Sequence, residues 1–541
     1  MTSAASTAVP TGAHALIIPE RRPLIPGDGP QSMAEILDRP VAQTPDALAV
    51  VGESGRMSYR ELDRAVDRAA NALTDLGVGS GDRIGAALPN DVEIIVIFLA
   101  TMRIGAVWVG IPRILAAAEK AYLCSDAEVS VLFADPAVSD EIRSHRDEFP
   151  PGMQDVLVDP DTTTSGWHRL VDAASEVHEF SPVDPFAPAA ISYTSGTTGR
   201  PKGAVHSQHN LLMPGAVTVA AGEFPADGPL GTSAPFTVLN VLVLIPITAF
   251  QAGATAVMID GNRPDNVAAW VEREQIMHMV AVPTVYHDLL ADQSVTREQL
   301  ASLRRPRSGG AAVTEALRRR WLERFGHPLT SSLALTEAPT FVSREDTSTP
   351  RVENSLGRAV AHVEITVVDE LDRPVAVGQA GEICVSPATT GTWAGVYTPM
   401  LGYWGRADET QHALRGGMLH TGDIGRLDAD GNLSLVDRKS SLIIRGGSNI
   451  YPAEVERVLD LDARIAECAL VPRPDERLGE RTVAFVELES GADATAEEIR
   501  AHCAAHLARY KVPDEIRIVD RLPRTAIGKV HRFELHTWAG A

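Results

Sequence analysis

The chain of 541 residues carries 71 acidic and 49 basic side chains, which gives a formal net charge of -22 at pH 7. This acidic excess argues against a nucleic-acid-binding protein or one that docks on an anionic membrane, because both classes usually present a basic face. With 44% hydrophobic and 22% charged residues, the composition is that of a globular protein, and the length predicts more than one domain. Four widely spaced cysteines without a CxxC pair predict buried thiols in a reducing compartment rather than a disulfide framework or a zinc site.

The N-terminal stretch is rich in Pro, Gly, Ala and Ser, and it lacks the basic start and apolar core of a signal peptide. We expect a disordered or irregular tail over residues 1–30. Residues 94–111 and 229–259 are strongly apolar, but Arg103 interrupts the first, and prolines, glycines and amides interrupt the second. Buried strands and helices are therefore favoured over membrane spans, and we expect a cytoplasmic protein.

Strands and helices alternate from about residue 58 onward. Ser58 can cap a helix whose apolar residues recur at helical spacing as far as Gly77. Residues 83–88 are typical of a strand, residues 91–107 of a buried helix and turn, and residues 128–135 of a second strand. The alternation predicts an α/β fold with a largely parallel sheet.

The pattern changes after about residue 360. Residues 363–387 and 425–439 contain alternating runs joined by turns, with a tight hairpin expected at Asp430-Gly431, so they predict a β-rich module. After Lys439 the pattern becomes a compact α+β one. We therefore predict a large N-terminal domain of layered α/β subdomains plus a β-rich subdomain over 31–438, and a small mobile α+β domain over 439–541.

The stretch ISYTSGTTGRPKGAVH, residues 191–206, combines a strand with a loop of hydroxyls, glycines and one lysine. Glycines let backbone N–H groups converge on an anion, and Lys202 adds a cation. The pattern is not a Walker A loop, and Pro201 prevents regular helix there. The residues favour a mobile phosphate-binding loop over a plain Ser/Thr/Gly surface linker.

The loop resembles the phosphate loop of the adenylate-forming superfamily, which includes acyl-CoA synthetases, adenylation domains and luciferases. Nine further motifs follow in the order of that superfamily and span nearly the whole chain from about residue 35: VPTVY (282–286), RSGGAAV (307–313), LTEA (335–338), SLGRAV (355–360), GEICV (381–385), LGYW (401–404), LHTGDIG (419–425), VDRKSSLIIRGGSNIYPAEVE (436–456) and LPRTAIGKVHRFEL (522–535). The chain is identified as a member of this superfamily, similar to acid–CoA ligases.

The resemblance implies a role for particular residues in the first step, in which a carboxylate and ATP give acyl-AMP and pyrophosphate. Lys529 would bridge the attacking carboxylate and the α-phosphate, Thr336 would approach that phosphate, and Glu337 would hold Mg²⁺. Asp423 would accept the ribose hydroxyls. The remaining nucleotide contacts would come from Thr194, Ser195, Gly196, Thr197, Thr198 and Lys202 at the phosphates, Gly310, Ala311 and Ala312 at adenine, and Arg438. A positioned cation at Lys529 also makes physical sense, since it offsets the repulsion between two anions.

The resemblance implies a second step in which CoA displaces AMP after the C-terminal domain swings about a hinge at Ser440. Gly446 and Gly447 would then flank a tunnel for the pantetheine thiol, where glycine leaves room. A plain strand-to-turn pair of glycines is the alternative interpretation of these two residues.

The chain departs from the common family pattern at four places. Thr237 stands where an aromatic gating His is common, and Leu333-Ala334 replaces Tyr-Gly. Met418 replaces Trp before the Thr-Gly-Asp motif, and Ser440 replaces Asp or Lys at the hinge. These changes leave the adenylation residues intact, but they leave open which acid is activated and which acceptor receives it. The alternative interpretation is neutral variation within a CoA ligase.

The acid pocket is expected to draw on small, apolar or weakly polar residues, which favour an acid with an apolar or aromatic body. The residues are Thr237, Asn240, Val241, Val282, Gly309 and Leu333. No Arg or Lys is among them to pair a second carboxylate. Asn240 can bond either a polar substituent of the acid or local backbone.

The leading hypothesis is an AMP-forming acid–CoA ligase that uses ATP, Mg²⁺ and CoA and acts as a monomer or homodimer. An alternative is an adenylate-forming enzyme with another acceptor: a carrier-protein thiol, an amine, or nitrite activated for diazotisation of an aryl amine. A non-catalytic ATP-binding protein is a third option, and the presence of Lys529, Glu337 and Asp423 argues against it.

Overall fold

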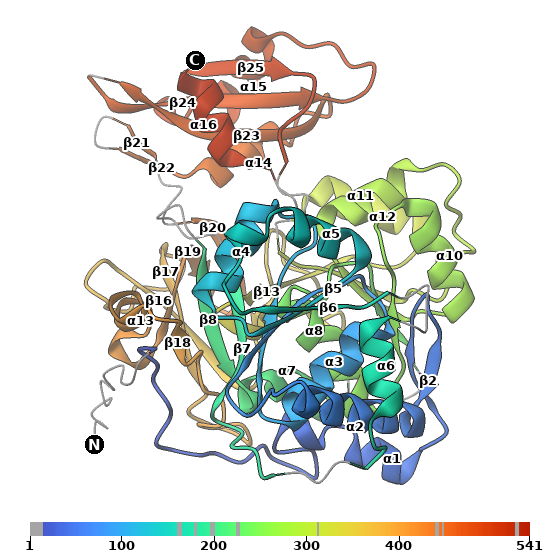
Figure 1. Cartoon of the computed structure of the whole chain (residues 1–541). Coiled ribbons are helices and arrows are strands. Elements are labelled where there is room, and N and C mark those ends of the chain that lie inside the picture. The colour runs from blue at the N-terminus through green and yellow to red at the C-terminus, as the bar shows by residue number, and fades with distance from the viewer. Residues whose placement is uncertain are drawn as a thin grey trace.

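The computed structural model describes residues 14–159, 165–177, 181–194, 201–222, 228–310, 313–438, 443–445, 448–475, 477–524 and 530–540. A large N-terminal domain carries a small C-terminal domain, shown in orange and red above it (Figure 1). The fold is α/β, as predicted. Residues 14–32 form no helix or strand, yet His14 stacks on Trp404 and Ile25 is buried.

A sheet of mainly parallel strands forms the first half of the N-terminal domain. Its order is β18-β8-β7-β4-β3-β5-β6, and only the pairs β7–β8 and β8–β18 are antiparallel. The bounds are β3 Arg83–Ala87, β4 Val107–Gly110, β5 Val131–Ala134, β6 Gln154–Leu157, β7 Pro188–Thr194, β8 Lys202–Ser207 and β18 Gly402–Tyr403. The predicted strands at 83–88 and 128–135 are confirmed.

A second sheet, of order β15-β14-β13-β12-β11-β9-β10-β1-β2, forms the other half. Its centre, from β13 to β1, is parallel. The bounds are β1 Leu48–Val51, β2 Arg56–Ser58, β9 Leu230–Thr232, β10 Ala256–Met258, β11 His278–Ala281, β12 Arg305–Ser308, β13 Thr330–Leu335, β14 Ala338–Arg344 and β15 Arg358–Ala359.

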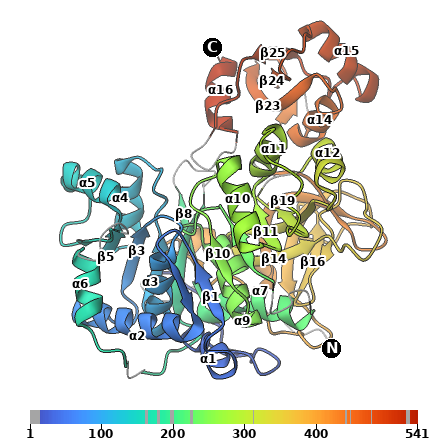
Figure 2. The ribbon, with the colours of Figure 1, turned by 90° about the vertical axis from the view of Figure 1, so that its right-hand side faces the viewer.

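Helices fill the space between the sheets and cover their outer faces (Figures 1 and 2). The helix predicted after Ser58 is α2, whose cap is the Ser58 hydroxyl accepting from the Glu61 N–H. The bounds of the helices in this half are η1 Met33–Glu35, α1 Asp38–Gln43, α2 Tyr59–Asp75, α3 Val92–Arg103, α4 Ala117–Asp126, α5 Pro136–Ser144, η2 Arg146–Glu148 and α6 Gly166–Ala173. Those that follow are α7 Gln208–Ala220, α8 Leu239–Leu242, η3 Val243–Ile247, α9 Thr248–Ala252, α10 Pro264–Glu274, α11 Pro283–Ala291 and α12 Glu315–Phe325.

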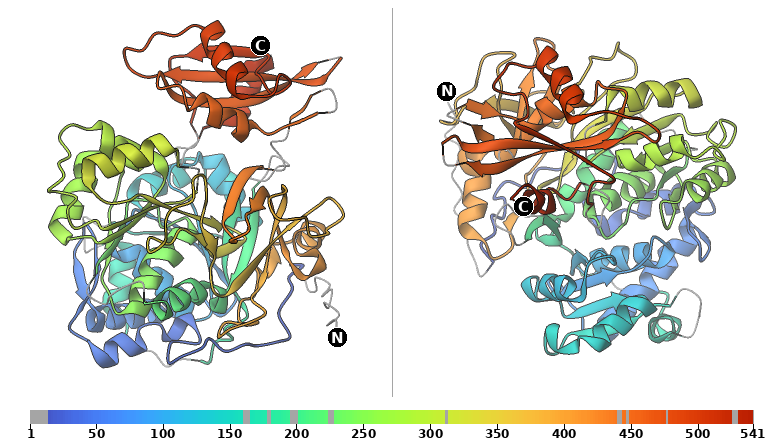
Figure 3. Two further views of the ribbon diagram at one scale, coloured as in Figure 1. Left: turned by 180° about the vertical axis from the view of Figure 1, so that it is seen from behind. Right: turned by 90° about the horizontal axis from the view of Figure 1, so that it is seen from above.

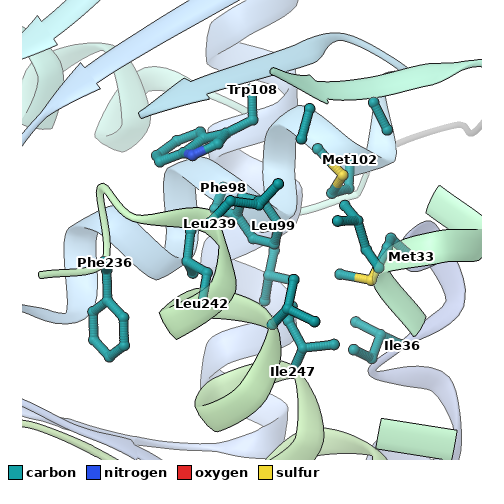
Figure 4. Close-up of a cluster of buried hydrophobic side chains, with 14 of the residues drawn as sticks. Met33, Ile36, Phe98, Leu99, Met102, Trp108, Phe236, Leu239, Leu242 and Ile247 are labelled. Atoms are coloured by element: carbon teal, nitrogen blue, oxygen red, sulfur yellow. The ribbon is translucent and has the colours of Figure 1, made fainter. Parts of the chain in front are cut away.

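The main core lies between the two sheets. Phe98 and Leu99 of α3 face Leu239 and Leu242 of α8, below Trp108 of β4 (Figure 4). Burial of such large apolar side chains contributes about 1.5–3 kcal/mol each, so this core holds α8 firmly. Both apolar stretches questioned as membrane spans lie here as strands and helices, and no described helix is long and apolar enough to cross a membrane.

The β-rich module and the C-terminal domain complete the chain. The module is a four-stranded antiparallel sheet, β16-β17-β19-β20, and Gly431 turns its last hairpin with a φ of 79°. Its elements are β16 Val363–Val368, β17 Gly381–Pro387, α13 Ala407–Ala413, η4 Arg415–Gly417, β19 Leu419–Leu427 and β20 Leu433–Arg438. The C-terminal domain contains β21 Ile443–Arg445, β22 Ser448–Ile450, α14 Pro452–Leu459, β23 Ile465–Asp475, β24 Gly479–Leu488, α15 Ala496–His506, β25 Glu515–Val519 and α16 Arg532–Gly540.

The C-terminal domain lies over α11 and α12 (Figures 2 and 3). An exposed ion pair joins the two domains there, with Arg320 Nη1 3.7 Å from Glu489 Oε1. Exposed pairs of this kind contribute little, about 0–1 kcal/mol, so this contact does not lock the two domains together.

Candidate active site

The predicted phosphate loop lies between two antiparallel strands, β7 and β8. Thr194 ends β7 and pairs with Lys202 at the start of β8, so the predicted loop between them is closed at its base by a strand ladder. Tyr193 of β7 donates to Asp126 Oδ2 at 2.9 Å and so holds the end of that strand. Tyr122 donates to the carbonyl of Pro201, just before β8, at 3.1 Å. Ser195, Gly196, Thr197 and Thr198 lie outside the described residues.

Tyr403 links Lys202 to Glu337. The Lys202 Nζ lies 5.6 Å from the centre of the Tyr403 ring, and the Tyr403 hydroxyl donates to Glu337 Oε1 at 2.8 Å. β18 places this tyrosine, because Tyr403 pairs with Ala204 of β8, the second strand of the hairpin. The predicted phosphate-binding lysine and the predicted metal ligand are thus held by one side chain.

Thr336 and Glu337 form the two-residue turn between β13 and β14, where Leu335 pairs with Ala338. The His206 Nε2–H donates to the carbonyl of Thr336 at 2.8 Å and fixes this turn from below. Burial lowers the pKa of His206 to about 4, so the imidazole is neutral at pH 7. The turn is therefore anchored by a neutral donor, which adds no charge beside the predicted phosphate position.

Asp423 lies in β19 and is 2% exposed. Its backbone N–H donates to Thr421 Oγ1 at 3.1 Å, and the Thr421 hydroxyl donates to the carbonyl of Ile383 at 2.8 Å. Glu382 Oε1 accepts from the Gly422 N–H at 3.2 Å. The turn that presents Asp423 is thus bound to β17 from both sides, and Arg438 of β20 lies opposite Asp423 in the strand register.

The residues predicted to line the acid pocket are here called the acid region, and two of them lie where parallel strands of the second sheet end. Val282 follows β11 and Gly309 follows β12, and these strands are neighbours. The ends of parallel strands are the usual place for a ligand in such sheets. Gly310, with a φ of 79°, continues the chain in a conformation that favours glycine. Ala311 and Ala312 lie outside the described residues.

Thr237, Asn240 and Val241, the next members of the acid region, lie in α8 and just before it. Because Leu239 and Leu242 point into the core of Figure 4, the helix turns Asn240 and Val241 toward its other side, and α8 packs against β14. Within the described part of the chain, Thr237 Oγ1 and Asn240 Oδ1 are buried without a hydrogen-bond partner. Leu333 of β13 is 8% exposed and packs in the main core.

Three residues at these sites were not predicted. Tyr403 lies in the motif LGYW, but without the strand pairing no role could be assigned to it. His206 follows the phosphate loop, where its burial was not visible in the sequence. Gly110 ends β4, and a Cβ there would lie 1.9 Å from the carbonyl oxygen of Thr237, so only glycine lets the first sheet approach the acid region.

The residues predicted for the second step, and Lys529, remain predictions. Lys529, Ser440, Gly446 and Gly447 all lie outside the described residues, and Arg438 is described only as part of β20. Met418 precedes β19 and joins the short helix η4 to it.

Comparison with known proteins agrees with this arrangement. Residues 37–404 match the family model of the AMP-binding enzymes, and residues 454–529 match that of the AMP-binding enzyme C-terminal domain. An indoleacetate–CoA ligase from Aromatoleum aromaticum is 33% identical over 509 residues, covering 93% of this chain and 97% of the relative.

Two proteins of known structure share the fold of this chain over nearly its whole length. ATP-bound MatB from Rhodopseudomonas palustris has a TM-score of 0.85 at 28% identity, covering 93% of this chain and 98% of MatB, whereas apo MatB gives 0.75. The amide bond synthetase McbA from Marinactinospora thermotolerans has a TM-score of 0.81–0.82 at 27% identity and covers 94% of this chain and 99% of McbA.

The fold and the site define an ATP-dependent adenylate-forming enzyme. The chain belongs to the AMP-binding enzyme family and is an AMP-forming acid–CoA ligase, a class that uses ATP and CoA.

Proposed function

We propose that this enzyme activates a carboxylic acid with an apolar or aromatic body as its acyl-AMP, and then passes the acyl group to CoA. In the first step a carboxylate oxygen attacks the α-phosphorus of ATP, the bond to the β-phosphate oxygen breaks, and pyrophosphate leaves. In the second step the CoA sulfur attacks the acyl carbon, AMP leaves with the oxygen, and the thiol proton passes to water.

The observation that carries this proposal is the linked set Lys202, Tyr403 and Glu337 beside the Thr336 turn. The two ends of this set have opposite charges, as binding of phosphates and of a cation requires. Glu337 fits Mg²⁺, because Mg²⁺ is usually held by one or two carboxylates together with substrate phosphates. When bound, Mg²⁺ would supply charge neutralisation at the phosphates.

The roles of the other predicted site residues are proposed from their places in the family motifs. Thr194 and Lys202, with the loop between them, bind the β- and γ-phosphates. Gly310 and the two following alanines bind adenine, and Asp423 accepts from the ribose hydroxyls. Arg438 contacts the nucleotide, and Lys529 stabilises the transition state of adenylation.

The swing of a C-terminal domain, residues 439–541, about Ser440 is also proposed. The TM-score of MatB against this chain is 0.85 with ATP bound and 0.75 without, a difference that a movement between domains of MatB would account for. The CoA thiol would then reach the acyl-AMP between Gly446 and Gly447.

The acid is proposed to bind in the acid region. Leu333, Val241 and Val282 offer apolar contacts to its body, and an indoleacetate–CoA ligase is among the relatives. Incubation with ATP, Mg²⁺, CoA and a panel of aryl and aliphatic acids tests the assignment. We expect AMP, pyrophosphate and an acyl-CoA thioester; adenylate formation without any thioester would contradict the CoA step.

A non-CoA acceptor is the second candidate, and the similarity to the amide bond synthetase McbA favours it. Thr237 motivates it too, because a small side chain in place of a gating His leaves a different route to the acyl carbon. The same incubations with amines, a carrier protein, or nitrite plus an aminoaryl acid in place of CoA distinguish the two. AMP release that depends on one of these and not on CoA would establish the alternative.

A further inference from the structure

Arg307 is a basic side chain next to the acid region that the predicted pocket residues do not include. It lies in β12, two residues before Gly309, and its Cζ lies 5.0 Å from the centre of the Phe341 ring on β14. Phe341 is 5% exposed, so the guanidinium is held over a buried ring.

The strand register shows which side of the sheet Arg307 faces. Arg307 lies opposite Val280 of β11, and residues opposite each other share a face. Val280 packs against the core between the sheets, whereas its neighbours Met279 and Ala281 pack against the outer helices. Arg307 therefore points to the inner side, where Val241 of α8 and Ala334 of β13 also pack.

The charge of Arg307 is unmatched in the part of the chain that the structure describes. No described carboxylate forms an ion pair with it, and the nearby Glu345 is bound by Arg318 Nη1 at 2.9 Å and by the Ser331 N–H at 2.5 Å. Burial lowers the pKa of Arg307 to about 10, so it remains a cation at pH 7. Arg307 is half-buried, and a charge that is partly removed from water without an anionic partner is costly; a cation–π contact offsets only about 0.5–2 kcal/mol of that cost.

We propose that Arg307 binds an oxygen acceptor at the end of the acid remote from the activated carboxylate, and that a second oxyanion, carboxylate or sulfonate, binds most strongly. The planar guanidinium matches such a group with two parallel hydrogen bonds. Asn240, whose Oδ1 lacks a partner among described residues, lies on α8, which packs against β14, the strand of Phe341, and it can bond the same end of the acid. This inference rests on the proposed function, and it names the class of substrate: acids with an apolar body and a polar far end.

The test compares matched acids on one enzyme preparation. Wild type, Arg307→Met and Arg307→Lys are assayed for thioester formation with cinnamic, 4-hydroxycinnamic and 4-carboxycinnamic acids, and with hexanoic and adipic acids. The ratio of kcat/KM within a pair does not depend on how much of the variant is folded. The KM for ATP, measured alongside, reports damage to the nucleotide site.

We expect wild type to prefer the acid with the oxygen acceptor in at least one series. Arg307→Met should lower that preference about 10- to 100-fold, since a hydrogen bond to a charged group contributes about 1.5–3 kcal/mol. Arg307→Lys should keep part of it. An unchanged ratio in Arg307→Met, or a wild-type preference for the unsubstituted acids, would overturn the proposal while leaving acid–CoA ligation intact. Failure of the wild type to form a thioester from any acid would overturn the proposed function and this inference with it.

Discussion

The nucleotide side and the acid side of the site differ in how their polar groups are bound. On the proposed nucleotide side the Tyr403 hydroxyl donates to Glu337 and the His206 Nε2–H donates to the Thr336 carbonyl, while His206 Nδ1 has no partner among the described residues. On the proposed acid side, the hydroxyl of Thr237 and the Oδ1 of Asn240 have no hydrogen-bond partner among the described residues, and the Arg307 guanidinium contacts the Phe341 ring. The first side is preorganised for a substrate shared by a whole family, whereas the second leaves donors and acceptors for a particular acid.

The largest effect expected lies on the nucleotide side. Lys529→Ala should lower the rate of pyrophosphate release about 10²- to 10³-fold with ATP binding retained, because the lysine acts on charge that develops in the transition state. Pyrophosphate release and equilibrium ATP binding measure the two effects. The exposed Arg521, on the segment before it, provides the control as Arg521→Ala. An unchanged rate in Lys529→Ala would remove Lys529 from the mechanism.

Low pH should weaken the hydrogen bond by which His206 holds the Thr336 turn. The pKa of His206 is lowered from 6.5 to about 4 by burial, so between these values the unfolded chain binds a proton that the native protein does not. Stability is full above pH 6.5 and falls by about 3 kcal/mol from this residue as the pH drops to 4. Urea unfolding at pH 7 and pH 4.5 checks the sign.

His206→Gln provides the comparison, because glutamine can donate to the Thr336 carbonyl but does not titrate. We expect its free energy of unfolding to change less with pH than that of the wild type. Buried His362, whose pKa is lowered to about 3 by burial, remains in both proteins and accounts for part of the residual slope. Equal slopes in the two proteins would show that His206 is protonated in the native state.

Tyr403→Phe tests the contact that Tyr403 makes with both Lys202 and Glu337. It removes the hydroxyl that donates to Glu337 and keeps the ring beneath Lys202. A hydrogen bond to a carboxylate contributes about 1.5–3 kcal/mol, so we expect a roughly tenfold or larger rise in the Mg²⁺ concentration needed for half-maximal rate. Tyr510→Phe, at an exposed tyrosine, is the control. Identical Mg²⁺ curves for the wild type and Tyr403→Phe would show that Tyr403 has no part in metal binding.

The smallest effect expected is on the acid side. Thr237→Val removes a buried hydroxyl without a partner in the described structure, so stability should stay equal or rise by about 1 kcal/mol. The kcat/KM for polar acids should fall, and that for ATP should not. Thr218→Val removes a buried hydroxyl that donates to the Pro214 carbonyl at 2.6 Å, and it should destabilise the protein. Equal destabilisation by both changes would show that Thr237 has a structural partner.

The sequence alone determined the family, the α/β fold and the order of the motifs, because glycine-rich loops and strand–helix alternation are local patterns. It also predicted α2 from its Ser58 cap and the hairpin at Gly431 from turn chemistry. Only the tertiary structure brought Tyr403 between Lys202 and Glu337, since 66 residues separate Tyr403 from the glutamate and the pairing of β18 with β8 is what puts the tyrosine beside Lys202. Likewise, only the register of β12 against β11 shows that Arg307 lies on the inner face of the sheet. Side-chain identity is fixed by sequence, but which face a strand residue presents, and what remains unpaired there, is decided by packing.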